Sequence, residues 1–140
     1  MTGIPQVGQD YSYAEVRAFY MPDVTALHFV LIKDGKIVAL RVREDYNPNI
    51  FNDPAEVWVG AKGEVKTRGD ELADRDEPAP LFVKKRDREE YTFMGNYQVR
   101  GSKTEGEAVT NARAAMKKVH KQGVSRIVIM KKRRAAGSSL

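Results

Sequence analysis

The sequence predicts an α+β domain in which a curved, mostly antiparallel sheet or a small open β-barrel packs against two helices. Three observations support this fold class: segments rich in β-branched and aromatic residues outnumber helical ones, short turns join them, and two amphipathic segments begin with a capping box. The chain has 140 residues, of which 41% are hydrophobic, and this suits one domain with a proper core. We expect the domain to span residues 1–130, followed by a basic, disordered tail over 131–140.

Two segments carry the signals of helices. Ser12 and Glu15 have the capping-box spacing and predict a short helix directly after Ser12. Thr104 and Glu107 have the same spacing and predict a second, longer helix that ends near Gly123. The apolar face expected for this second helix comprises Ala108, Ala112, Ala115, Met116 and Val119.

A β-hairpin is the clearest local prediction. The runs 25–33 and 36–42 are rich in aliphatic and β-branched residues, and Asp34-Gly35 joins them. Asp-Gly favours a type I′ turn, in which both central residues take positive φ. The polar segment 44–55 follows as a long loop, and loops of this length often carry function.

The remaining strands follow along the second half of the chain. They are expected at residues 57–59, 64–66, 81–84, 91–100 and 124–130. Gly95 marks a bulge or a close approach within its strand. The acidic segment 69–76 is expected to form a single helical turn.

The net charge of +5 suggests a polyanionic partner, because basic surfaces attract nucleic acid through counterion release. The cations gather in three groups, which are Lys84, Lys85, Arg86 and Arg88; Lys117, Lys118 and Lys121; and Lys131, Lys132, Arg133 and Arg134. We expect Lys117, Lys118 and Lys121 to contact backbone phosphates from the polar face of the second helix. The alternative is that these groups merely solvate the surface and the tail.

Several function classes lack their sequence signals. The chain has no cysteine, which excludes disulfides, thiol catalysis and cysteine-built zinc sites. No apolar run approaches the roughly 20 residues of a membrane span, and the N-terminus does not read as a secretory signal. We therefore expect an intracellular protein, cytoplasmic or nuclear, without a membrane partner.

Catalytic and cofactor motifs are also missing from the pattern. His28 lies in an apolar run and is expected in the core, while His120 lies in the basic helix. No catalytic triad order, P-loop or dinucleotide fingerprint is present, so we predict neither a cofactor nor a metal. Asp53 followed by Glu64-Val65-Lys66 has the spacing of a metal-dependent nuclease, which leaves that enzyme class open as an alternative.

Five short segments between residues 37 and 100 follow one another in a familiar order. They are Ile37–Leu40, Asn47–Asn49, Glu56–Gly60, Pro80–Val83 and Tyr91–Val99. Their order resembles that of PUA-like and SRA-like reader modules, which accompany restriction endonucleases. The resemblance implies a barrel-like fold that recognises modified bases by flipping them into an aromatic-lined pocket. No nuclease domain is recognised, so it implies a reader alone or a subunit that recruits an effector nuclease.

Candidate base-binding residues lie mainly in the polar loop and the strand after it. The candidates are Tyr46, Asn47, Asn49, Trp58, Asp70 and Tyr91. Tyr46 or Trp58 could stack on a base, while the amides and the carboxylate could hydrogen-bond to its edge. We expect the loop Tyr46–Asn49 and the strand at Trp58 to form two walls of a pocket with Asp70 at its floor. The alternative places Trp58 in the core.

Four functions remain open from the sequence. The resemblance favours the first, a module that recognises modified DNA bases. An RNA-binding PUA-like module is the second, because a basic surface does not distinguish DNA from RNA. The third is a protein-interaction or structural subunit with an incidental basic surface, and the fourth is the small nuclease.

Overall fold

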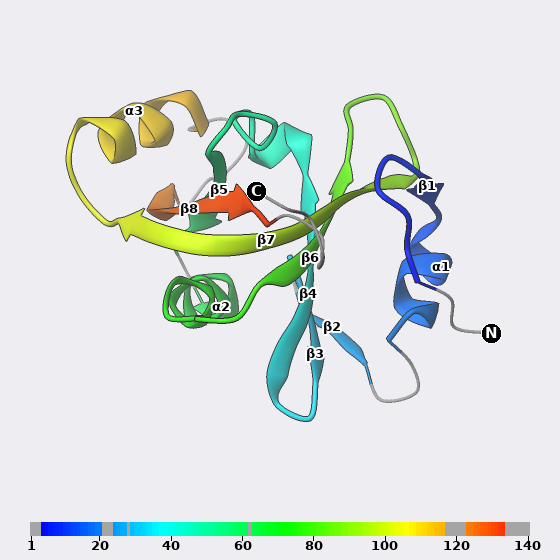
Figure 1. Cartoon of the computed structure of the whole chain (residues 1–140). Coiled ribbons are helices and arrows are strands. Elements are labelled where there is room, and N and C mark those ends of the chain that lie inside the picture. The colour runs from blue at the N-terminus through cyan, green and yellow to red at the C-terminus, as the bar shows by residue number, and fades with distance from the viewer. Residues whose placement is uncertain (1–3, 21–23, 28, 62, 117–122, 134–140) are drawn as a thin grey trace.

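The computed structural model describes residues 4–20, 24–27, 29–61, 63–116 and 123–133 (Figure 1). In this part of the chain the strands are β1 (Asp10–Tyr11), β2 (Thr25–Leu27), β3 (Val30–Lys33), β4 (Lys36–Arg43), β5 (Ala55–Gly60), β6 (Ala79–Lys84), β7 (Tyr91–Lys103) and β8 (Val124–Lys132). The helices are α1 (Tyr13–Ala18), α2 (Gly63–Ala73) and α3 (Glu107–Met116), and a 3₁₀ turn, η1, covers Glu44–Tyr46.

The strands form one curved sheet in the order β2-β3-β4-β6-β7-β8-β5, with β1 paired to β7. All neighbouring strands are antiparallel except β4 and β6, which run parallel. The long strand β7 bends across the middle of the molecule (Figure 1). The predicted α+β class with a mostly antiparallel, curved sheet is therefore confirmed, but three α-helices are present where two were expected.

Local signals form the hairpin and the first helix as predicted. Asp34 and Gly35 take φ values of 53° and 76°, as a type I′ turn between β3 and β4 requires. The Ser12 hydroxyl accepts the Glu15 N–H at 3.1 Å, and the Glu15 carboxylate accepts the Ser12 N–H at 2.8 Å. The run 25–33 is not one strand, however, because the chain turns back within it and β2 pairs antiparallel with β3.

Helix α2 corrects the prediction of a strand at 64–66 and a single turn at 69–76. In place of these two elements, one helix begins at Gly63, continues through Gly69 and ends at Ala73. Gly69 lets α2 approach β5 closely, since a Cβ atom added there would lie 2.2 Å from Cγ1 of Val59. The glycine is therefore required by packing and not by a turn.

We expect Gly69→Ala to destabilise the fold, although alanine is the better helix former by about 1 kcal/mol. Overpacking of this kind costs about 1–3 kcal/mol, and the clash with Val59 points to the upper end of that range. Urea denaturation measures the loss, with Gly101→Ala as the control, because a Cβ atom there would meet nothing within 4 Å. Equal stability of the two variants would mean that α2 does not pack closely on β5.

Both ends of the α3–β8 segment differ in detail from the prediction. The helix begins at Glu107, directly after Gly106 with its φ of 103°, so Thr104 lies before the turn that enters the helix. The buried residues of α3 are Val109, Ala112 and Met116, while Ala108 and Ala115 are exposed. The larger valine, spaced three and seven residues from the other two, sets the face that packs on the sheet.

The expected tail begins later than residue 131. β8 continues to Lys132, and the backbone N–H of Arg133 donates to the carbonyl of Asn96 at 2.8 Å. Pairing with β7 therefore orders the first residues of this basic run. Residues 134–140 lie outside the described part of the chain.

The core has three clusters, because the sheet is covered on more than one face. An interior cluster lies between the curved sheet and α2 and includes Leu40, Val57, Val59 and Leu72. A second cluster packs α1 around Phe82, and a third packs α3 against Trp58 and Ile127. Within the described residues, no helix is both long and apolar enough to cross a membrane.

Candidate functional site

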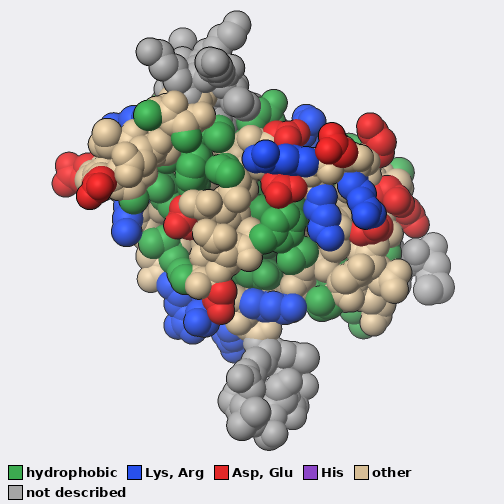
Figure 2. All heavy atoms as spheres, turned by 90° about the horizontal axis from the view of Figure 1, so that it is seen from above, with side chains coloured by type: hydrophobic (Ala, Val, Ile, Leu, Met, Phe, Trp, Pro, Cys, Tyr) green, Lys and Arg blue, Asp and Glu red, His purple; other side chains and the backbone are tan. Residues whose placement is uncertain are grey.

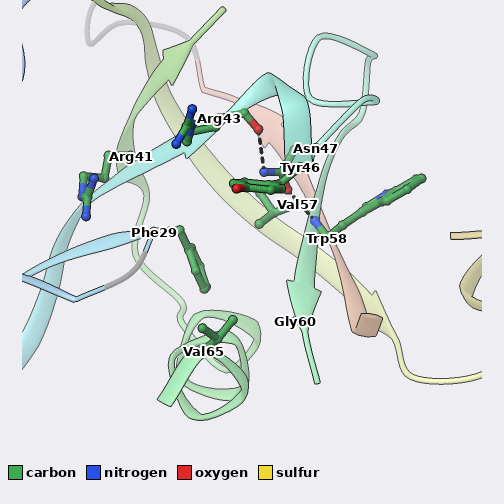
Figure 3. Close-up of a pocket in the computed structure, with 9 residues that line it drawn as sticks. All are labelled: Phe29, Arg41, Arg43, Tyr46, Asn47, Val57, Trp58, Gly60 and Val65. Atoms are coloured by element: carbon green, nitrogen blue, oxygen red, sulfur yellow. Dashed lines mark hydrogen bonds between the residues drawn. The ribbon is translucent and has the colours of Figure 1, made fainter. Parts of the chain in front are cut away.

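A cavity of about 290 Å³ opens between the end of β4 with η1 and the strand β5 (Figure 3). Its lining residues are Phe29, Arg41, Arg43, Tyr46, Asn47, Val57, Trp58, Gly60 and Val65. β4 and β5 are not neighbours in the sheet order, since β5 pairs with β8 at the far end. We call the junction of β4, η1 and β5 the seam, and the cavity in it the seam cavity.

Asn47 joins the two sides of the seam. Its amide nitrogen donates to the Arg43 carbonyl at 2.9 Å, and its amide oxygen accepts the Trp58 backbone N–H at 2.7 Å. The side chain is only 4% exposed. Because both ends of the amide are engaged within the protein, Asn47 holds the walls of the cavity together, and we no longer assign it to reading a base edge.

The Trp58 ring belongs to the core and does not form the expected stacking wall. It points away from Tyr46 and the cavity (Figure 3), is 9% exposed, and packs in the cluster with α3. Its indole N–H donates to the Glu56 carboxylate at 3.0 Å. Side chains alternate along a strand, so Val57 and Val59 face the interior cluster while Trp58 faces α3.

Asp70 does not form the floor of the cavity. It lies on α2, where its carboxylate pairs with Lys66 at 3.2 Å and with Arg126 at 3.0 Å. The sequence placed Asp70 after a strand, whereas the helix directs it toward β8. Val65, one turn earlier on α2, lines the cavity instead.

Asn49 and Tyr91 also lie outside the cavity lining. The Asn49 amide donates to the Glu56 carboxylate at 3.1 Å, which ties the loop to β5. Tyr91 is buried in the cluster with α1, and its hydroxyl accepts from Arg41 at 3.4 Å. Asn49 and Tyr91 therefore contact residues near the cavity but do not line it.

Tyr46 is the one candidate whose ring faces the cavity, and the aromatic and basic lining residues Phe29, Arg41 and Arg43 were not predicted. Figure 3 shows Phe29, Arg41 and Arg43 around the same space as Tyr46. The Arg43 guanidinium lies over the Tyr46 ring, 5.5 Å from its centroid. The alternation Arg41-Val42-Arg43 places the two arginine side chains on the opposite side of β4 from Val42, which packs in the interior cluster.

The basic groups on the surface are partly offset by carboxylates. Arg88 pairs with Asp10 at 3.2 Å, and Arg86 lies 3.7 Å from Asp45. On the face shown in Figure 2, Lys and Arg side chains lie next to Asp and Glu side chains around a hydrophobic area. Lys117, Lys118 and Lys121, which we expected to contact phosphates, lie outside the described residues.

The pattern considered for a nuclease falls on a helix and not on a strand. Glu64 and Lys66 occupy the start of α2, and Lys66 pairs with Asp70. Asp53 lies in the loop before β5, where its carboxylate is 3.6 Å from the Lys131 ammonium. Within the described ranges, no three His, Asp or Glu side chains gather in a group that could hold a metal ion.

Comparison with known proteins gives no relative: the chain matches no protein-family model, no curated protein and no solved structure. The function therefore has to be inferred from the seam cavity and its lining.

Proposed function

We propose that the protein is a nucleic-acid-binding module that accepts a single flipped-out, modified DNA base in the seam cavity. The observation that supports this most is that two aromatic residues, Phe29 and Tyr46, and two arginines, Arg41 and Arg43, line one small cavity. Its volume of about 290 Å³ is at the low end for small-molecule pockets and suits a ligand the size of a single base.

The chemistry of the lining matches what a flipped base requires. Base-flipping proteins hold the extruded ring by stacking and read its edge with a few polar groups. Phe29 and Tyr46 offer ring faces, and Arg41 and Arg43 offer hydrogen-bond donors. The cost of extruding a base from the duplex is lowest for a mismatched or damaged base.

The proposal is for binding and not for catalysis. Among the described residues, the polar side chains of the lining are those of Arg41, Arg43, Tyr46, Asn47 and Trp58, which include no nucleophile with an adjacent base. A reader of this kind would mark a site on DNA and leave cleavage to a partner protein.

Replacing Tyr46 tests the proposal directly. We expect Tyr46→Ala to weaken binding to duplexes carrying the preferred modified base by about 5- to 150-fold, because a stacked base contributes about 1–3 kcal/mol. Weak binding to unmodified duplex should persist, since phosphate contacts do not depend on the cavity. Fluorescence anisotropy measures the ratio of modified to unmodified affinity. The ligands are unmodified, methylated, hydroxymethylated and glucosylated DNA, and matching RNA.

A matched control is available in the same loop. Phe51 is 41% exposed and does not line the cavity, so Phe51→Ala should leave the ratio of modified to unmodified affinity unchanged. The proposal is rejected if Tyr46→Ala melts normally and keeps its base preference. Tighter binding to modified RNA than to modified DNA would favour an RNA-binding module over a DNA-binding one.

A further inference from the structure

We propose that a groove along β7, separate from the seam cavity, binds a short segment of a partner protein that is both apolar and acidic. The groove has a volume of about 800 Å³ and shares no lining residue with the seam cavity. The inference therefore goes beyond base binding and does not depend on it. The apolar residues of the groove lining are Ile4, Pro5, Val7, Tyr20, Pro80 and Phe93.

The groove lies at a break in one edge of β7, whose other edge is occupied by β6 along this stretch. From one direction the N-terminal segment reaches Phe93, whose carbonyl accepts the Gly8 N–H at 2.9 Å. From the other direction the end of β8 reaches Asn96, whose carbonyl accepts the Arg133 N–H at 2.8 Å. Among the described residues, neither segment pairs with residues 94–95, which lie between them. The two segments therefore form the walls of the groove.

The first argument is that the groove exposes aliphatic side chains that nothing in the described chain covers. Ile4 is 82% and Val7 58% exposed, the highest values for large hydrophobic side chains among the described residues. Exposed apolar groups that gather at one place beside polar ones are typical of protein interaction sites. Tyr20 and Phe93 pack in the cluster around Phe82, so the most exposed apolar surface is aliphatic. Such a surface suits a peptide side chain better than a nucleotide base, which stacks on aromatic rings.

The second argument is the charge of the groove. Lys132 and Arg133 are the charged residues of its lining, which contains no Asp or Glu. Both are exposed, and no carboxylate of the described residues lies within 4.0 Å of either. The Arg133 Nη1 atom donates to a neutral partner, the Gln98 Oε1 atom, at 2.9 Å. Two cations without an acidic partner favour an acidic segment over a basic or neutral one.

The third argument is that one cation lies directly beside the apolar surface. A Cβ atom added at Gly95 would lie 2.9 Å from Cε and 3.7 Å from Nζ of Lys132, and 3.6 Å from Cγ2 of Val7. The Lys132 side chain therefore lies across β7 at Gly95, close to Val7. A segment that covers Val7 with an apolar side chain places its neighbouring residues near the ammonium group. Because alternate side chains of an extended chain share one side, we expect Asp or Glu within two positions of the apolar residue.

Short peptides of defined sequence test the groove directly. Acetylated and amidated heptapeptides would carry Leu, Ile, Phe or Trp followed by two glutamates between Gly-Ser flanks. Matched peptides would replace the glutamates with lysines, or the apolar residue with serine. Heteronuclear NMR titration at about 0.15 M salt measures affinity and locates the peptide. The best acidic peptide should bind about tenfold more tightly than its lysine counterpart, because two exposed ion pairs replace two like-charge contacts. Its shifts should centre on Val7, Gly95 and Asn96.

Variants connect the binding to the groove. Val7→Asp should weaken the best acidic peptide by more than about tenfold, because it removes an apolar contact and adds a like charge. Val7 is exposed, so melting should be unchanged. Lys132→Met should weaken binding about 2- to 5-fold, the range of one exposed ion pair. Lys131→Met is the matched control, because Lys131 does not line the groove and its ammonium lies 3.6 Å from Asp53. Tyr46→Ala should also leave peptide binding unchanged.

The outcomes separate the possible occupants. Equal binding of acidic and lysine peptides, or no shifts at the groove up to about 1 mM peptide, overturns the inference. If groove signals shift with protein concentration alone and Val7→Asp abolishes the shift, the groove joins two copies of the chain and the inference is wrong. It is also wrong if unmodified duplex DNA shifts these signals and no peptide does. Acidic-peptide binding that persists without any base preference supports the inference and rejects the proposed function alone.

Discussion

Trp58→Ala should lower the free energy of unfolding by about 3–5 kcal/mol, the usual cost of truncating a buried large aromatic side chain. The ring fills the contact between the sheet and α3, where Val109, Met116 and Ile127 surround it. The substitution also removes the donor to Glu56. Urea denaturation and thermal melting measure the loss.

The same variant separates a role in the core from a role in the cavity. Because the ring points away from Tyr46, the ratio of modified to unmodified DNA affinity should be unchanged in the fraction that remains folded. Trp58→Phe, which restores most of the buried surface but not the bond to Glu56, should recover much of the stability. Normal melting of Trp58→Ala together with a lost base preference would show that the ring contributes to base binding and not to the core.

Asn47→Ala should be similarly damaging, for a different reason. It leaves the Trp58 N–H and the Arg43 carbonyl without their partner at the seam. Each unpaired buried group costs about 1–3 kcal/mol, so the loss should reach about 2–6 kcal/mol. Base-specific binding should fall with it, because the two walls of the cavity are no longer joined.

Asn49→Ala is the matched control for this substitution. Its amide bonds a partly exposed Glu56, so its loss should cost no more than about 1 kcal/mol. Asn47→Asp adds a second check, since a carboxylate can accept the Trp58 N–H but cannot donate to Arg43. Stability of Asn47→Ala equal to that of Asn49→Ala would show that other contacts hold the seam.

Features set by neighbouring residues could be predicted from the sequence. Asp34-Gly35 determines its turn through its own backbone preferences, and Ser12 caps its helix through Glu15, three residues away. The bulge expected in β7 lies directly before Gly95, because Leu81 and Phe82 pair with Gly95 and Phe93 and leave Met94 extra; few other residues adopt the φ of 108° found at Gly95. In each case the deciding interaction lies within a few residues of the chain.

Features set by residues that are distant in the sequence could not be predicted in this way. Gly69 was expected at the start of a single helical turn, and only the approach of Val59 explains a glycine in the middle of the longer helix. The sequence shows that Trp58 is a large aromatic residue on a strand. Which side of that strand faces a cavity depends on where α2 and α3 pack, and this the sequence does not show. The cavity itself arises where β4 comes close to β5, two strands that are not neighbours in the sheet, and no local pattern encodes that approach.

The position of β5 also has a consequence for how the chain folds during synthesis. The described residues that line the cavity all lie between Phe29 and Val65, in the first half of the sequence. Yet within the described chain β5 pairs only with β8, where Trp58 lies opposite Ile127. Such long-range pairing is slow to form, and chains fold from the N-terminus as they emerge. A nascent chain would thus carry all the lining residues well before it could assemble them, and binding competence would arise only once β8 is in place.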